Sequence, residues 1–412
     1  MMIPFFAPFT KSPEENTISL SYSLKRAKSD YSNSVDDALM QLASTIKFSA
    51  AYEASFRENN SSALYYSDIL GNEREQAIRN ALLHNVRVLD SLLLPPPLVS
   101  CVAEHASSAE SVPGLDSPPA TGASNYDDAL NIFTHLVRDY SSESDQAHNR
   151  YNFFLSQLPS FPPNPRILIP GAGMGKLGVV VAKELRNKCS IELNELSSGM
   201  AAAANQILNL NFSGQIFPFV NEVFANEVDS RRRVEEVEIS SPHHHNGISS
   251  YQIGDFVSIY AHPMKSNKFD IVLTHFFIDV IENMYELMLA VRNTLKTGGV
   301  WVNSGPLHYH KACKIRPSVD ELQILLVSMG FEIVHYEVNR ESNELYRIES
   351  DGTSYTKHEV YSSLEFKVMN NLKTEQLDAY RMITEGRIKA NQLAEAASKT
   401  DLVKSSVVIE EL

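Results

Sequence analysis

The chain has 412 residues, of which 43% are hydrophobic and 21% are charged, a composition that is ordinary for a globular protein. Lys and Arg number 36 against 50 Asp and Glu, and the resulting net charge of −14 disfavours nucleic acid or an anionic membrane surface as a partner. Three cysteines, Cys101, Cys189 and Cys313, lie far apart without a CxxC pair, which argues against a disulfide scaffold or a structural zinc site and favours a reducing compartment.

The first part of the chain, residues 1–106, is predicted to be a helical region. Its short apolar start, residues 1–9, has no basic flank and no small-residue cleavage site, so we expect no secretory signal. Apolar residues recur at helical spacing from Asp36 to Phe56 and from Arg74 to Leu94, where three prolines end the second helix. No apolar stretch in the chain approaches the ~18 residues of a membrane-spanning helix.

Residues 107–125 are rich in Ser, Pro, Gly and Ala, which is typical of a flexible linker. Short apolar strands then alternate with amphipathic helices, a pattern that predicts an α/β fold with a mostly parallel sheet covered on both faces. The predicted elements are the helix Tyr126–Tyr140, strand Arg166–Ile169, helix Leu177–Leu185, strand Cys189–Leu193, helix Met200–Leu210, strand Phe269–Leu273, helix Glu282–Lys296, strand Val300–Asn303, helix Val319–Ser328, and the closing strands Phe331–Val338 and Ser363–Val368.

Two further segments are predicted to be peripheral. Residues 226–250 are polar and biased in composition, so we interpret them as a surface insertion. The run His243–His245 within them has no carboxylate or cysteine at ligand spacing, so a solvated loop is expected and no metal site. Residues 370–412 are predicted to form a charged helical tail.

A glycine-rich segment, Ile167–Gly175, stands between a predicted strand and a predicted helix. Glycines there allow a ligand to approach the backbone at the helix N-terminus. A G-x-G-x-G loop serves a dinucleotide, a flavin or S-adenosylmethionine equally well, and it also occurs as a tight turn with no ligand. Glu195, 22 residues after Gly173, ends the next strand, where a carboxylate can accept both hydroxyls of a ribose.

Three more segments adjoin strands of the predicted sheet. Gly254–Phe256 precedes strand Phe269–Leu273, and the other two follow strands, at the edge where open α/β folds bind ligands. In Gly254–Phe256, an Asp beside an aromatic ring suits an adenine, although a solvated turn is the simpler alternative. Thr274–Asp279 and Asn303–His310 follow the next two strands, and Asp279 and His310 are therefore expected to converge. The chain contains no HExxH, GxSxG or GxxxxGK[ST] motif, so a zinc protease, an α/β-hydrolase and a P-loop hydrolase are poorly supported.

The order of these segments resembles that of class I S-adenosylmethionine-dependent methyltransferases, and more specifically the carnosine N-methyltransferase family. The resemblance spans about residues 35–369 and is weak in the N-terminal helices. The segments that carry it are VRDYS (137–141), ILIPGAGMGKLG (167–178), NELS (194–197), GDF (254–256), FDIVLTHFFIDVIEN (269–283) and LKTGGVWVNSGPLHYH (295–310). It implies a Rossmann-like sheet at residues 126–369 with helices on both faces, preceded by an N-terminal helical domain.

The resemblance also implies roles for individual residues. Arg138, with His135 three residues earlier, would hold the methionine carboxylate of the cofactor, although family members usually carry Gln where His135 stands. The remaining cofactor residues would be Gly171 and Gly173 at the methionine and ribose, Glu195 at the ribose, Asp255 and Phe256 at the adenine, and His275 beside the cofactor. The imidazole of the substrate would be bound by Asp279, His310 and Tyr361.

The implied reaction is methyl transfer from S-adenosylmethionine to the imidazole ring of carnosine or a related histidine-containing dipeptide, which converts carnosine to anserine. Departures from the family at His308 and Arg316 lie on the substrate side. Three alternatives stay open: methylation of a histidine in a peptide or protein, a non-catalytic member of the fold, and an NAD-dependent dehydrogenase with a similar glycine loop. We expect a cytoplasmic and also nuclear protein that forms a homodimer.

Overall fold

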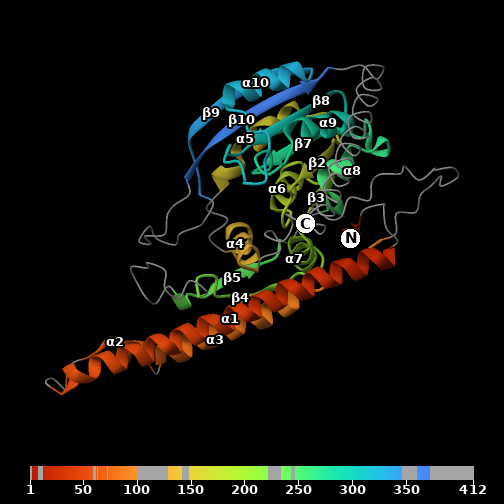
Figure 1. Ribbon diagram of the computed structural model, residues 1–412. Coiled ribbons are helices and arrows are strands. Elements are labelled where there is room, and N and C mark those ends of the chain that lie inside the picture. Colours follow the sequence, from red (N-terminus) through yellow and green to blue (C-terminus); the bar gives the residue numbers. More distant parts are fainter. Residues whose placement is uncertain are drawn as a thin grey trace, which may run out of the picture.

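The computed structural model describes residues 2–7, 13–58, 62, 64–71, 73–99, 129–141, 148–220, 233–242, 246–345 and 360–371. An eight-stranded sheet with the order β1-β6-β3-β2-β7-β8-β10-β9 forms its centre (Figure 1). The strands are β1 Phe5–Phe6, β2 Arg166–Pro170, β3 Ser190–Glu195, β6 Ile248–Ile253, β7 Phe269–His275, β8 Leu295–Ser304, β9 Phe331–Leu345 and β10 Val360–Asn370.

The sheet is parallel from β1 to β8, and β10 is antiparallel to both of its neighbours, β8 and β9. From β2, the chain moves outward to β3 and β6 on one side, and it then returns to β7 and β8 on the other. The order of the strands therefore reverses between β2 and β7, and the loops at the carboxyl ends of these strands form the expected ligand-binding edge. The predicted α/β class with a mostly parallel sheet is confirmed.

Helices cover both faces of the sheet, as predicted. The apolar sides of α8, α9 and α10 form one core with the fully buried Trp301 and Phe366. The other core joins the opposite face of the sheet to α1, α3, α4, α5, α6 and α7. The covering helices are α4 Ala129–Tyr140, α5 Asn152–Gln157, α6 Lys176–Glu184, α7 Ser198–Leu208, α8 Phe256–Tyr260, α9 Met284–Thr294 and α10 Val319–Ser328.

The N-terminal helices are longer and more closely joined to the sheet than the sequence predicts. Helix α1 runs from Pro13 to Arg57, well before the predicted start, and α3 spans Glu73–Leu92. Figure 1 shows α1 and α3 side by side beneath α7 and the strands β4 and β5, with their far end projecting beyond the sheet. Leu24 and Leu82 of these helices lie in the same core as the sheet, and β1 is itself a strand of that sheet.

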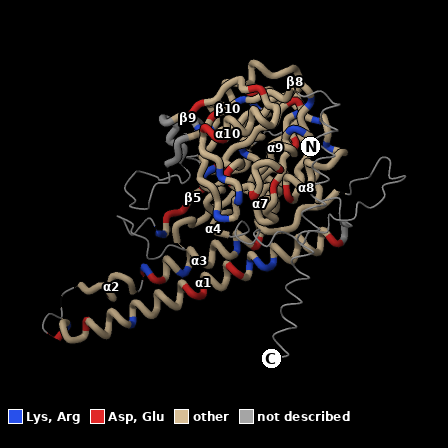
Figure 2. Tube along the Cα trace, turned by 45° about the horizontal axis from the view of Figure 1, so that its top comes forward, with Lys and Arg blue, Asp and Glu red and all other residues tan. Residues whose placement is uncertain are grey.

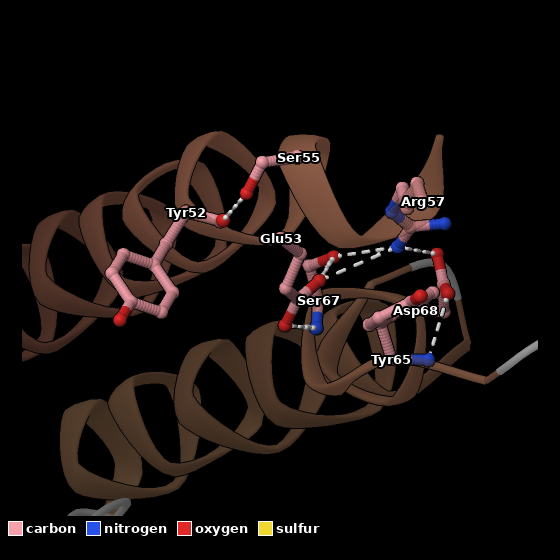
Figure 3. A network of polar contacts seen from close by, with 7 residues as sticks. All are labelled: Tyr52, Glu53, Ser55, Arg57, Tyr65, Ser67 and Asp68. Carbon is pink, nitrogen blue, oxygen red and sulfur yellow. Dashed lines mark hydrogen bonds and ion pairs between the residues drawn. The ribbon is translucent and has the colours of Figure 1, made fainter. Parts of the chain in front are cut away.

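A polar network closes the projecting end, where the short helix α2 (Tyr66–Leu70) folds back onto α1 (Figure 3). Arg57 donates a hydrogen bond to Asp68 at 2.7 Å and another to Ser67 at 3.0 Å. Glu53 accepts the Ser67 hydroxyl at 2.5 Å, and Tyr65 donates its backbone N–H to Asp68 at 3.0 Å. Because the Arg57–Asp68 pair is partly exposed, we expect the network to fix the turn geometry more than to add stability.

The segment predicted as a surface insertion contains parts of the fold. Strand β5 (Val237–Ser240) pairs with β4 (Ser213–Ile216), and Ile239 between them is fully buried. Strand β6 begins at Ile248, so the last residues of the predicted insertion belong to the central sheet. The run 243–245, the linker 107–125 and residues 372–412 lie outside the described residues, and the domain boundaries stay a prediction.

Charges of both signs are interspersed along α1 and α3 (Figure 2), as expected for solvated helix faces. Among the described residues, no helix is both long and apolar enough to cross a bilayer.

Candidate active site

The glycine loop that follows β2 adopts a backbone conformation that is unfavourable for residues other than glycine. Gly171 has φ +60° and Gly173 has φ +53°, both in the left-handed region that favours glycine. A Cβ on Gly171 would lie 2.4 Å from the ring of Phe277, closer than any real contact. The glycine loop therefore lies at the strand switch point in close contact with Phe277, and its role in ligand binding stays a prediction.

Glu195 is held against this loop at the end of β3. One carboxylate oxygen accepts the backbone N–H of Gly173 at 2.9 Å, and the other accepts the N–H of Ser197 at 2.9 Å. Each carboxylate oxygen can accept more than one hydrogen bond, so the group keeps capacity for hydroxyl donors. A preoriented carboxylate beside a glycine loop fits the diol of a nucleoside ribose.

Helix α4 and strand β6 fix the other side of the loop. The Tyr140 hydroxyl donates to the carbonyl of Met174 at 2.9 Å, and the Tyr251 hydroxyl donates to the carbonyl of Gly173 at 2.5 Å. His135 also faces the loop, with its Cδ2 3.8 Å from where a Cβ of Gly173 would stand. Burial lowers the pKa of His135 to about 4, so its ring is neutral.

Arg138 belongs to a buried charge cluster that sequence reasoning did not identify. It donates two hydrogen bonds to the Asp139 carboxylate, at 2.7 and 2.9 Å, and Arg150 contacts the same carboxylate at 3.3 Å. Burial raises the pKa of Asp139, but the charges of Arg138 and Arg150 and the hydrogen bond from Arg138 outweigh it and hold the pKa at about 2. Two guanidinium groups against one carboxylate leave one positive charge, which fits the carboxylate of a bound ligand.

His275, at the end of β7, is enclosed by aromatic rings. The rings of Tyr151 and Phe154 lie with their centroids 5.5 Å from that of His275. Burial lowers the pKa of His275 to about 3, so the ring is neutral. Its Nδ1 lies 2.9 Å from the carbonyl oxygen of Ser304 and must carry the proton, because a carbonyl only accepts.

The segment Gly254–Phe256 differs in part from its predicted role. Asp255 is the N-cap of α8 and accepts the backbone N–H of Ser258 at 2.8 Å. The Phe256 ring is only 2% exposed and stacks on Tyr260 at 4.9 Å. Packing against the core therefore occupies this ring, and the role of Phe256 at the adenine stays a prediction.

The ends of β7 and β8 approach each other unusually closely. Phe276 has φ +51°, rare for a residue with a side chain, and a Cβ on Gly305 would lie 2.8 Å from the Phe276 nitrogen. Below them, Trp301 donates to the hydroxyl of Thr274 at 2.8 Å, and Thr274 donates to Asn303 at 2.9 Å. This buried polar network fixes the relative position of the two strand ends that carry the predicted substrate residues.

Asp279 and His310, predicted to converge, are joined through their backbones. The Asp279 carboxylate, only 4% exposed, accepts the backbone N–H of His308 at 3.0 Å. The Asp279 carbonyl accepts the N–H of His310 at 3.1 Å and the thiol of Cys313 at 3.0 Å. Burial raises the pKa of Asp279 to about 6. Desolvation and the neighbouring His308 lower the pKa of His310, whose side chain is exposed.

The remaining predicted residue, Tyr361, lies on β10 with its backbone paired to Glu344, but its side chain is outside the described part of the chain. Asp139, Arg150 and Tyr151 are the site residues that sequence reasoning missed. The available signal was two charged residues, Arg138 and Asp139, adjacent to the apolar positions that α4 buries.

Comparison with known proteins shows the family. The family model for carnosine N-methyltransferase matches residues 118–371, more than half of the chain. The carnosine N-methyltransferase of Schizosaccharomyces pombe is 28% identical over 231 residues, which cover 49% of this chain and 61% of that protein. The Drosophila melanogaster protein "Carnosine N-methyltransferase unmet" is 33% identical over 183 residues, covering 41% of this chain and 38% of that one. The Mus musculus carnosine N-methyltransferase is 27% identical, with 64% and 68% covered.

Among solved structures, a putative sarcosine dimethylglycine methyltransferase from Galdieria sulphuraria matches with a TM-score of 0.36 and 11% identity, covering 56% of this chain and 91% of that one. Of the curated relatives, the chain matches only 61% of the length of the Schizosaccharomyces protein and 38% of the length of the Drosophila protein. The family model, matched over the glycine loop, Asp279 and His310 alike, is decisive. The chain belongs to the carnosine N-methyltransferase family.

Proposed function

We propose that this protein transfers a methyl group from S-adenosylmethionine to the imidazole ring of carnosine or a similar histidine-containing dipeptide, producing anserine from carnosine. The observation that carries the proposal is the buried carboxylate of Asp279. It stands at the carboxyl end of the sheet in a chain of the carnosine N-methyltransferase family. Its loop is joined to the loop that bears His310.

The residues around the glycine loop fit the donor. The net positive cluster of Arg138, Asp139 and Arg150 suits an amino-acid carboxylate, and Glu195 suits a ribose. When bound, S-adenosylmethionine supplies an electrophilic methyl group on a sulfonium. The protein contributes mainly alignment, since an in-line displacement depends on holding the nucleophile and the methyl group in line.

Asp279 has the properties needed to orient an imidazole. A neutral imidazole has one N–H and one lone pair, so a carboxylate that accepts the N–H determines which nitrogen attacks. Methylation turns the ring into a cation, and the nearby carboxylate stabilises that charge as it develops. With a pKa of about 6, Asp279 is ionised at neutral pH and is basic enough to take the proton from the ring. His310, on the adjoining loop, would orient the ring.

Two measurements test this function. S-adenosylhomocysteine should raise the melting temperature while NAD does not, since a ligand at a hundred times its Kd adds ~2.7 kcal/mol of stability. Labelled methyl groups from S-adenosylmethionine should then appear on carnosine. Transfer only to a histidine in a peptide or protein would show that the substrate is not carnosine, and stabilisation by NAD alone would contradict the methyltransferase proposal.

The cysteine usage of the chain, typical of a reducing compartment, supports a proposed cytoplasmic and nuclear location. We also propose that the protein forms a homodimer.

A further inference from the structure

The N-terminal strand β1 contacts a side chain that leads directly to the glycine loop. Phe5 pairs with Tyr251 in the parallel register of β1 and β6. Both residues are buried, and their rings stack with centroids 4.6 Å apart and planes inclined by 16°. In a close-packed interior, a stacked ring restricts the rotation of its partner, so Phe5 limits the positions that the Tyr251 ring can take.

The side chain of Tyr251 extends from β6 to the glycine loop, where its hydroxyl donates to the carbonyl of Gly173 at 2.5 Å. Burial raises the pKa of this hydroxyl well above its ordinary value, and the nearby charge of Glu195 acts in the same direction, so the group stays protonated and remains a donor. Gly173 is itself buried. A buried carbonyl that loses its donor is costly, so the Tyr251 hydroxyl stabilises this orientation of the Gly173 carbonyl.

Gly173 connects the Tyr251 hydroxyl to the carboxylate assigned to the ribose. Its backbone N–H donates to Glu195 at 2.9 Å, while its carbonyl accepts from Tyr251. The residue has φ +53°, so it is held from both sides in a left-handed conformation. A change in this conformation would turn the N–H away from Glu195, and the orientation of that carboxylate therefore depends on the position of the Tyr251 ring.

Strand β1 is firmly attached, so it can act as a support. The side chain of Asn209, at the end of α7, accepts the backbone N–H of Ile3 at 2.7 Å and donates to the Ile3 carbonyl at 2.9 Å. The Phe5 carbonyl accepts the N–H of Val99 at 2.8 Å. The Phe5 ring is thus fixed by contacts with α7 and with the segment after α3, independently of the ring on which it stacks.

We propose that Phe5 is a positioning residue for the cofactor, acting through Tyr251 and Gly173 on the carboxylate of Glu195. The inference rests on the proposed function, because it takes the glycine loop to be the site of S-adenosylmethionine. It makes cofactor affinity depend on strand β1, which lies outside residues 118–371, the part of the chain that the family model matches.

The test measures the Kd for S-adenosylhomocysteine by calorimetry in the full chain. Tyr251→Phe removes the hydroxyl and keeps the ring, so the Kd should rise about threefold to tenfold. Phe5→Leu keeps an apolar side chain but removes the stacking ring, and it should raise the Kd about threefold or more. Wild-type affinity in both variants would overturn the proposal. If Phe5→Leu does not fold, Phe5→Met, which keeps the volume without a ring, takes its place.

Each variant has a matched control. Phe6→Leu makes the same change at the next residue of β1, whose side chain points to the opposite face of the sheet. Tyr336→Phe removes another phenol that donates to a backbone carbonyl, that of Val319 at 2.5 Å, on the distant strand β9. Both controls should bind S-adenosylhomocysteine like the wild type. Losses of affinity in the controls equal to those in the test variants would overturn the specific role of Phe5.

A double variant separates a positioning role from a merely structural one. If Phe5 acts through the Tyr251 hydroxyl, Phe5→Leu should change the Kd less than about twofold once Tyr251→Phe is present. In the single variants, the KM for S-adenosylmethionine should rise with the Kd, while kcat and the KM for carnosine stay within about twofold of the wild type. Multiplied effects in the double variant, or equal rises in both KM values, would overturn the proposal.

Hydrogen exchange of the ligand-free protein separates this inference from the proposed function. Peptides that cover residues 171–175 should exchange faster in Phe5→Leu and in Tyr251→Phe than in the wild type, and Phe6→Leu should leave them unchanged. If the wild type binds no S-adenosylhomocysteine but the loop still exchanges faster in both variants, the cofactor assignment fails and the support of the loop by Phe5 stands. Unchanged exchange of the loop in both variants would overturn that support, whatever the activity.

Discussion

The carboxylate of Asp279 accepts a hydrogen bond from the backbone N–H of His308 at 3.0 Å, so the loop after β8 fixes a side chain of the loop after β7. The backbone of Asp279 is bound to the same neighbouring loop, through His310 and Cys313. A carboxylate anchored in this way loses little rotamer entropy when a substrate binds. The arrangement thus presents a carboxylate of fixed orientation to the imidazole, which favours a fixed orientation of the ring as well.

Activity should fall in acid as Asp279 is protonated. Burial raises the pKa of this carboxyl to about 6, above the ordinary value, so its charged form is lost as the pH falls through about 6. The protonated carboxyl no longer accepts the imidazole N–H, and protonation of the substrate ring, near ~6.5, acts in the same direction. We expect kcat at saturating substrate to decline below pH 6, and a pH-independent kcat between 5 and 8 would contradict this role.

Substitution of Arg138 should mainly weaken ligand binding, whereas substitution of Asp139 should mainly lower the stability of the fold. Arg138→Ala removes the charge assigned to the methionine carboxylate, so the Kd for S-adenosylhomocysteine should rise about tenfold to a hundredfold in calorimetry. Asp139→Ala instead leaves the guanidinium of the buried Arg150 without its carboxylate and should cost about 3 kcal/mol in urea denaturation. Unchanged ligand affinity in Arg138→Ala would remove this residue from the site.

A methyl group at Gly171 should be poorly tolerated. Gly171→Ala combines a left-handed backbone with a Cβ that would lie 2.4 Å from the Phe277 ring, so we expect a loss of about 2–4 kcal/mol and weaker S-adenosylhomocysteine binding. Gly298→Ala is the control, since Gly298 has φ +78° but nothing within 4 Å of the added atom. It should cost about 1–2 kcal/mol and leave ligand binding intact. Equal effects of the two variants would show that the close approach to Phe277 is unimportant.

Local sequence patterns predicted the core of the sheet because its strands are short apolar runs that are followed by glycine or by polar loop residues. Strand Phe269–Leu273 and helix Val319–Ser328 are found where expected. Strand β1 was missed because two residues, Phe5 and Phe6, carry no periodicity, and their pairing with β6 is a contact over long sequence separation. Such pairing depends on tertiary packing that local patterns do not encode.

The candidate site was predicted unevenly for a similar reason. Gly171, Glu195 and Asp279 directly follow or end strands, so topology alone places them at one edge. The cluster of Arg138, Asp139 and Arg150 forms where α4 contacts the turn before α5. The spacing of these residues in the sequence does not predict this contact. Phe256 was placed at the adenine from its position beside Asp255, and the sequence did not show that its ring packs into the core.

The most direct test of the central claim is the effect of Asp279→Asn on the transfer of labelled methyl from S-adenosylmethionine to carnosine. Asn cannot hold the charge that stabilises the methylated ring, so kcat should fall about 100-fold or more. The Kd for S-adenosylhomocysteine should stay within about twofold of the wild type, because Asp279 lies outside the residues assigned to the cofactor. A mutant that keeps wild-type turnover, or one that loses turnover only because it no longer binds S-adenosylhomocysteine, would contradict the account.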